Sequence, residues 1–312
     1  MTEQPPAAVS EDLDRLRSAL DAAIPGKTDS NLLVGTWNIR ALGDLTNKWL
    51  AGPKDSPKRD WHAIACLAEV ISRFDVAAVQ ESRRNPAALT RLMTSLGDQW
   101  QVIVSDVTEG AAGNGERLAF LYDSTRIRPS GLVGEIVLPP IGEAPARQFA
   151  RTPYTASFAR SRVQFTLATV HVLWGKDETE RLPEITEFAQ WMHDWAVRPD
   201  EWNTNLMVLG DFNLDRIGDP LYEAFISTGL WPPAELNAAP RTIFDDDKSK
   251  HFYDQLAWFS KPDGTSLLEG LAYGQRAGTF DFIPHVFPGL SRDEVSWRIS
   301  DHYPLWCEFL LS

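Results

Sequence analysis

Apolar residues follow two different spacings along the chain, and these spacings predict alternating helices and strands. Recurrence every three or four residues is typical of a helix with one buried face, whereas a short apolar run is typical of a buried strand. The helical spacing predicts helices over residues 11–24, 61–74, 86–96, 178–196 and 220–228. The apolar runs predict strands over residues 32–37, 75–80, 101–105, 117–122, 154–159, 163–172, 206–210, 255–259 and 303–311. Because the two kinds of segment are interleaved, we expect helices and sheets packed in layers around one core.

Capping and turn residues set the expected ends of several helices. Residues 1–9 are expected to form a loose tail, and Ser10 is expected to cap the first helix. Pro25 is expected to end that helix, because proline cannot continue it. Asp219 followed by Pro220 predicts the start of another helix.

Composition excludes two broad classes of protein. The chain has 312 residues, of which 43% are hydrophobic and 23% charged, a balance typical of a folded protein rather than a disordered one. Acidic residues outnumber basic ones by 43 to 30, which gives a formal charge of −13 and excludes a histone-like DNA binder. An enzyme acting on phosphates is still allowed, because bound divalent cations can reverse the local sign of a site.

Several smaller features add expectations. Cys66 and Cys307 each lie in an apolar segment and are expected to be buried free thiols. The 12 tryptophans are expected to serve mainly in packing, with one or two near a substrate. The acidic run at residues 245–247 is expected to be a solvated loop. No stretch has the length of a membrane span and no leader pattern is visible, so we expect a cytoplasmic protein; a signal already removed would leave the same sequence.

Polar side chains of catalytic and metal-binding types gather at the ends of the predicted strands. A side chain at a strand end is held by a rigid scaffold and faces solvent or a cleft. Each position alone is weak evidence for an active site, because strand ends are commonly polar, but together the positions favour one. The positions are Asn38, Arg40, Glu81, His171, Asp211, Asn213, Asp254, Asp301 and His302.

The spacing of Asp211 and Asn213 allows two interpretations. In an extended segment, residues two apart point to the same side. Such an oxygen pair suits Mg²⁺, Mn²⁺ or an attacking water. The same spacing is also typical of an Asx-turn that ends a strand. The two residues alone do not decide between these interpretations.

The order of short motifs resembles a known family. TWNIR, QE, ERLAFLYD, ARTP, TVH, GDFN, YDQ and SDHYP occur in the order typical of the endonuclease/exonuclease/phosphatase superfamily, and within it the chain is similar to the deoxyribonuclease I family. The resemblance covers residues 31–312. It implies an α/β four-layer sandwich, in which two mixed sheets pack face to face and helices cover their outer faces. Since the motifs would meet in one cleft, we expect a tail and short helix over residues 1–30 and one domain over residues 31–312.

The resemblance also implies metal ligands. Glu81 corresponds to the principal ligand of a divalent cation, with Asn38 and Asp301 beside it. Asp211 and Asn213 correspond to residues that hold the nucleophilic water and the phosphoryl oxygens, or a second metal. The implied cofactor is therefore Mg²⁺ or Mn²⁺, as one or two ions.

Acid–base and substrate-binding roles follow from the same resemblance. His302 corresponds to the imidazole nearest the scissile phosphate, oriented by Asp254. His171 corresponds to the second histidine, with Glu116 as its carboxylate partner. Which histidine is the base and which the acid stays open. The residues that match contacts to substrate phosphates are Arg40, Arg83 and Arg151.

The implied function is a metal-dependent phosphodiesterase, specifically a deoxyribonuclease I-like endonuclease that cleaves DNA. The chain departs from deoxyribonuclease I at Asn114 and Gly115, where that family has a minor-groove tyrosine, and it lacks the structural disulfide. One alternative is a phosphodiesterase or phosphatase acting on a small or lipid-derived phosphoester. A second alternative is a non-catalytic binding module with the same fold. Oligomeric state and a preference for DNA or RNA are not indicated.

Overall fold

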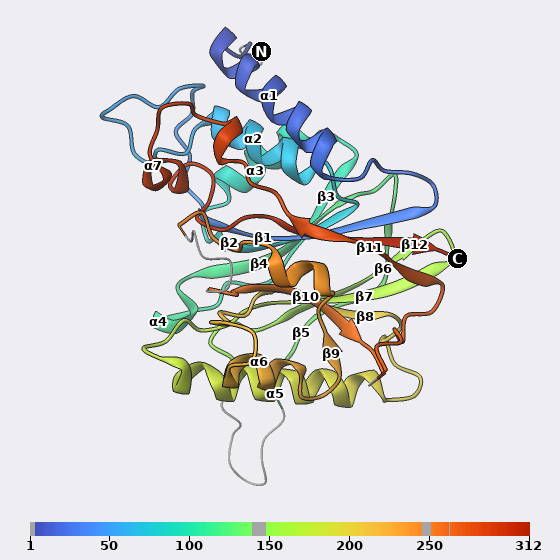
Figure 1. The fold of residues 1–312 in the computed structure, drawn as a ribbon. Coiled ribbons are helices and arrows are strands. Elements are labelled where there is room, and N and C mark those ends of the chain that lie inside the picture. The colour runs from blue at the N-terminus through green and yellow to red at the C-terminus, as the bar shows by residue number, and fades with distance from the viewer. Residues whose placement is uncertain (1–3, 139–147, 245–250, 262) are drawn as a thin grey trace.

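Two six-stranded mixed sheets face each other in the computed structural model, which describes residues 4–138, 148–244, 251–261 and 263–312 (Figure 1). The acidic run at residues 245–247 lies outside the described residues. The first sheet has the order β11 (Leu271–Thr279), β12 (Leu305–Leu311), β1 (Asn31–Leu42), β2 (Val76–Arg83), β4 (Glu116–Asp123) and β3 (Trp100–Val104). The second has the order β5 (Arg128–Glu135), β6 (Tyr154–Arg160), β7 (Val163–His171), β8 (Leu206–Asp211), β10 (Asp254–Phe259) and β9 (Leu230–Trp231).

Each sheet contains one parallel pair among antiparallel neighbours. The parallel pairs are β1 with β2 and β7 with β8. These strands are buried on both faces, which explains why they show near-continuous apolar runs in the sequence. The carboxyl ends of parallel strands lie at the same sheet edge, so each pair brings the residues that follow its apolar run to one place.

Apolar side chains fill the space between the sheets and on both outer faces. Phe120, Phe158, Phe165 and Phe309 are fully buried between the sheets. The outer face of the first sheet is covered by α1 (Ala7–Ala23), α2 (Trp61–Ile71) and α3 (Ala87–Leu96), and that of the second by α5 (Glu178–Ala196) and α6 (Pro220–Ile226) (Figure 1). The remaining short helices are α4 (Gly110–Gly113), η1 (Ala234–Ala238), η2 (Ile283–His285) and α7 (Arg292–Ser296). The four-layer sandwich expected from the sequence is confirmed.

The first helix begins earlier than its sequence predicts. It starts at Ala7 with Pro6 at the N-cap, so Ser10 lies inside the helix and the expectation of a Ser10 cap is wrong. The chain from Ala7 onward is therefore helix and not tail. Val9 is fully buried, and this apolar contact extends the helix by a turn beyond the polar capping signal. The cap at Asp219 is confirmed, because its side chain accepts a hydrogen bond from the backbone N–H of Tyr222 at 2.8 Å.

Both cysteines behave as expected. Cys66 and Cys307 are buried and free, and burial raises the pKa of each thiol. Among the helices in the described part of the chain, none combines the length and the apolar character that crossing a bilayer requires.

Candidate active site

The register of the second sheet places three chemically active residues side by side. His171 at the end of β7 pairs with Asp211 at the end of β8, and Asp211 pairs with Asp254 at the start of β10. Because β7 and β8 are parallel and β10 is antiparallel to β8, the carboxyl ends of β7 and β8 and the start of β10 lie at the same edge of the sheet. All three side chains are buried.

The first sheet contributes ligands from the facing edge. Asn38 lies within β1, one residue beyond the predicted strand end, and pairs regularly with Gln80. Glu81 lies within β2 because the pairing resumes at Ser82 after an irregularity. Glu81 sits at such an irregularity between β2 and β4 and has a φ of 60°. Bulges of this kind re-aim a side chain near an active site. Glu116 begins the antiparallel strand β4 and so reaches the same edge.

His302 forms a close pair with Asp254. Its Nδ1 lies 2.6 Å from Oδ2 of Asp254, so Nδ1 donates to the carboxylate and Nε2 faces the cleft. Burial alone would lower the pKa of His302, but the nearby carboxylates of Asp254, Asp211 and Asp301 outweigh it and raise the pKa to about 10. Ser300 fixes the backbone here: its Oγ donates to the carbonyl of Asn38 at 2.6 Å and accepts from the N–H of His302 at 3.0 Å.

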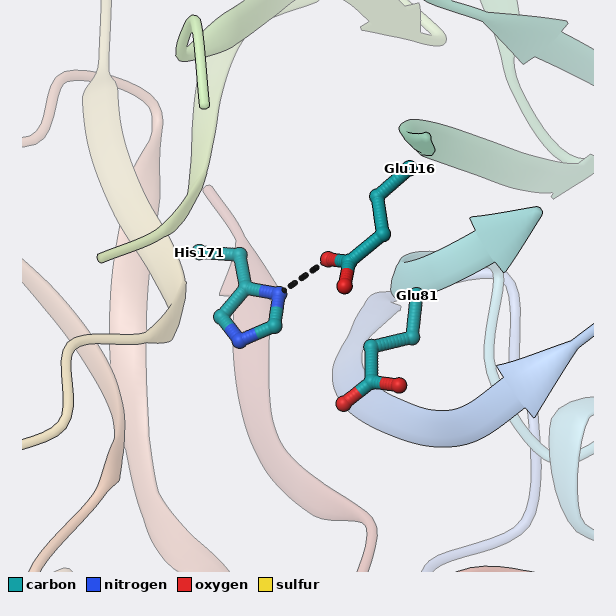
Figure 2. A group of neighbouring side chains, drawn as sticks. All are labelled: Glu81, Glu116 and His171. Atoms are coloured by element: carbon teal, nitrogen blue, oxygen red, sulfur yellow. Dashed lines mark hydrogen bonds and ion pairs between the residues drawn. The ribbon is translucent and has the colours of Figure 1, made fainter. Parts of the chain in front are cut away.

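His171 forms a similar pair with Glu116, drawn in Figure 2 beside Glu81. Its Nδ1 lies 2.8 Å from Oε2 of Glu116. Burial alone would raise the pKa of Glu116, but the hydrogen bond and charge of His171, together with Arg151 and Arg83, outweigh it and lower the pKa to about 2. Glu116 is therefore a carboxylate at neutral pH, and it holds the His171 ring with Nε2 toward the cleft.

Asp211 lies between the two histidines. Its Oδ2 is 3.6 Å from Nε2 of His171 and 3.9 Å from Nε2 of His302. The same oxygen accepts a hydrogen bond from Nδ2 of Asn38 at 2.9 Å. The other oxygen accepts a hydrogen bond from the backbone N–H of Asn213 at 3.0 Å. The two residues therefore form the Asx-turn, and the role of this oxygen pair toward a metal ion or a water stays a prediction. The side chain of Asn213 donates to the carbonyl of Val172 at 2.7 Å.

The donor atoms fit a divalent cation. Glu81, Glu116 and His171 each offer a ligand atom within 4.8 Å of the others, and so do Asp211, Asp254 and His302. Oδ1 of Asn38 is buried and has no hydrogen-bond partner among the described residues, which is the condition of an acceptor that a cation would satisfy. Carboxylate and amide oxygens are the ligands that Mg²⁺ and Mn²⁺ prefer.

The predicted substrate arginines take three different positions. Arg83 reaches Glu81 at 3.2 Å and Glu116 at 3.4 Å. Arg40 lies 3.6 Å from Asp301, at the outer side of the site. Arg151 is buried, and its Nε lies 2.7 Å from Oε2 of Glu116. The side chains of Arg40 and Arg83 are thus partly exposed, whereas the buried side chain of Arg151 forms an ion pair with Glu116.

Two residues near the site escaped the sequence analysis. Arg59 is buried and donates hydrogen bonds to the carbonyls of Arg40, Ala41, Arg298 and Ile299. Trp297 is half exposed beside Arg40. Neither lies at a predicted strand end. Only the position of Trp297, shortly before the SDHYP motif, could have drawn attention to it.

Comparison with known proteins supports a shared family. The sequence model described as the Endonuclease/Exonuclease/phosphatase family matches residues 35–302. A protein of Thioalkalivibrio sp. (strain K90mix) named Deoxyribonuclease is 29% identical over 301 residues, covering 92% of this chain and 73% of that protein.

Solved structures share the fold at low identity. TDP2 of D. rerio, humanized by 14 mutations, has a TM-score of 0.58 and 16% identity, covering 90% of this chain and 99% of that one. The mannosyl-6-phosphatase of Bacteroides thetaiotaomicron VPI-5482 has a TM-score of 0.57 and 16% identity, covering 89% and 99%. At these identities the likeness shows the fold and leaves the substrate open.

Proposed function

Because the chain belongs to the endonuclease/exonuclease/phosphatase family, we propose that it is a divalent-metal-dependent phosphodiesterase that cleaves DNA as an endonuclease. The observation that carries the proposal is the approach of two histidine–carboxylate pairs to one oxygen, Oδ2 of Asp211. A purely structural cluster has no need to hold two imidazole Nε2 atoms toward the same point of a cleft.

The arrangement matches what phosphodiester hydrolysis requires. The reaction needs an activated water, neutralised charge on the phosphoryl oxygens and a proton for the leaving alkoxide. His171 and His302, each oriented by a carboxylate, supply the proton donor and the proton acceptor at their Nε2 atoms. Asp211 and Asn213 orient the water and the phosphoryl oxygens. A Mg²⁺ or Mn²⁺ ion held by Glu81, with Asn38 and Asp301, supplies charge neutralisation when bound.

DNA as the substrate is supported by the relative named Deoxyribonuclease and by the arginines at the site. Arg40 and Arg83 lie on the outer side of Glu81 and Asp301, where phosphates that flank the scissile one would pass. Arg151 acts through Glu116, and its contact to a substrate phosphate stays a prediction. A small ester with a single phosphate presents no flanking phosphate for the outer arginines to bind.

A substrate panel tests the proposal. Supercoiled plasmid, RNA, bis-p-nitrophenyl phosphate and inositol phosphates are each incubated with Mg²⁺, Mn²⁺ or EDTA, with the His302→Ala variant as the matched control for contaminating nucleases. We expect metal-dependent plasmid nicking that EDTA and the variant abolish. Hydrolysis of inositol phosphates alone would favour the small-phosphoester alternative. Metal binding without turnover of any substrate would favour a binding module.

A further inference from the structure

A pocket of about 470 Å³ opens beside Glu81, on the outer side of the catalytic cluster. Its size lies within the roughly 300–1,000 Å³ that small-molecule sites occupy. It shares walls with the cluster, because Arg83 contacts Glu81 and Arg40 contacts Asp301. The side chains that characterise its walls are those of Arg40, Arg59, Arg83, Arg84, Asn85 and Trp297.

Three guanidinium groups line the pocket, those of Arg40, Arg83 and Arg84. Each also pairs with a neighbouring carboxylate: Arg40 with Asp301, Arg83 with Glu81 and Glu116, and Arg84 with Glu109. Arg59 also lines it, but its guanidinium is committed to backbone carbonyls. Guanidinium groups in such a wall recognise phosphate oxygens. These donors therefore suit a ligand that carries a phosphate and lies outward from Glu81.

Trp297 gives the pocket an aromatic wall, which the binding of a phosphate group alone does not require. Trp297 is 50% exposed, although a side chain of this size gains much by burial. The guanidinium carbon of Arg40 lies 3.6 Å from the centroid of the indole ring. Nη1 of Arg40 donates to Oγ of Ser296 at 2.8 Å, so the guanidinium is fixed over the ring. Arg40 and Trp297 together form a rigid layer of planar groups.

We propose that this pocket binds one unpaired nucleotide of the DNA substrate, next to the phosphate that is cleaved, with its base stacked on the Arg40–Trp297 layer. The proposal rests on the proposed function and adds a substrate preference to it. Aromatic and guanidinium planes bind the faces of bases without regard to sequence. In an intact duplex those faces are covered by neighbouring base pairs, so the pocket favours single-stranded or frayed DNA.

A binding experiment in the inactive His302→Ala background tests the pocket. Fluorescence anisotropy measures the affinity for a labelled single-stranded oligonucleotide and for a labelled hairpin duplex, with and without Trp297→Ala. Loss of one base–aromatic stack is expected to weaken single-strand binding about 10-fold and to change duplex binding little. Trp297→Phe keeps a ring and should restore most of the affinity. Trp231→Ala, which removes another half-exposed tryptophan at the far edge of the second sheet, is the matched control and should change neither.

The same variants in the active background separate this proposal from the one on which it rests. Trp297→Ala should lower the ratio of kcat/KM for single-stranded over duplex DNA about 10-fold. If the wild type cleaves DNA but Trp297→Ala changes binding to neither form, or to both equally, the pocket proposal is wrong and the nuclease proposal stands. If the wild type cleaves no DNA, both proposals are overturned.

Discussion

Arg59 donates a hydrogen bond from Nη2 to the backbone carbonyl oxygen of Arg40 at 2.6 Å, across 19 positions of the chain. Its other donors bind the carbonyls of Ala41 at 2.8 Å and of Arg298 at 2.9 Å. The N–H of Ala41 in turn donates to Oε2 of Glu81 at 2.9 Å. One buried guanidinium thus ties the end of β1, which orients Glu81, to the segment that leads to Asp301.

Arg59→Lys is expected to misplace the candidate metal ligands Glu81 and Asp301, because an ammonium group lacks the planar fork that reaches several carbonyls at once. We expect kcat/KM to fall about 10-fold and the Mg²⁺ concentration for half-maximal activity to rise. Arg160→Lys is the matched control, since Arg160 also binds backbone carbonyls from a buried position but lies away from the site. A fall in melting temperature in both variants, with no change in metal requirement in Arg59→Lys, would reduce Arg59 to a structural role.

Glu81→Gln tests the metal site itself. The amide keeps the shape of the side chain and can still accept the hydrogen bond from Ala41, so the fold should be retained. Loss of the negative charge is expected to lower metal affinity and activity strongly. Isothermal titration with Mn²⁺ and circular dichroism measure the two effects separately. Glu69→Gln, on α2, is the control and should bind metal normally. Unchanged metal dependence in Glu81→Gln would remove Glu81 from the site.

The two histidines should act as one unit. His171→Ala and His302→Ala are each expected to lower kcat at least about 100-fold, because each removes a proton donor or acceptor in the reaction. The double variant should lose less than the product of the single losses, since both Nε2 atoms serve the same phosphoryl group beside Asp211. The measurement is single-turnover cleavage of a labelled oligonucleotide. Near-normal turnover in one single variant would contradict the role of that histidine.

The polar residues at strand ends are the part of the candidate site that the sequence could predict. His171, Asp211 and Asp254 each sit at an end of a buried strand, and the sheet register alone brings them together. The same logic located Glu81 and Asn38, although Glu81 lies at a bulge inside its strand, which no apolar pattern reveals.

The rest of the fold and site depends on contacts that no local pattern encodes. β5 lies at a sheet edge with exposed positions and two glycines, so it shows no apolar run and was not predicted. β11, the exposed edge strand of the other sheet, was missed for the same reason. Arg59 lies in a loop, and its partner Arg298 is 239 positions away. A buried arginine of this kind is indistinguishable in sequence from a surface charge.

A pH-dependent stability is expected from His62, at the contact between α1 and α2. His62 is 3% exposed, and its ring lies 4.2 Å from that of Phe287, centroid to centroid. Neither ring nitrogen makes a hydrogen bond with the described residues, although Nε2 lies 3.4 Å from Oδ2 of Asp12. Burial lowers the pKa of His62 to about 4, and the attraction of Asp12 offsets this only in part.

The sign of the effect follows from this lowered pKa. Between pH 6.5 and about pH 4 the unfolded chain binds a proton at His62 and the folded chain does not, so the free energy of unfolding falls as the pH falls. The loss from this residue between pH 7 and pH 5 is about 2 kcal/mol. Urea unfolding at both pH values measures it, and His62→Leu, which fills the site without a titrating group, should show a correspondingly smaller loss. An equal loss in the wild type and the variant would mean that His62 is already protonated in the folded chain or that other groups set the dependence.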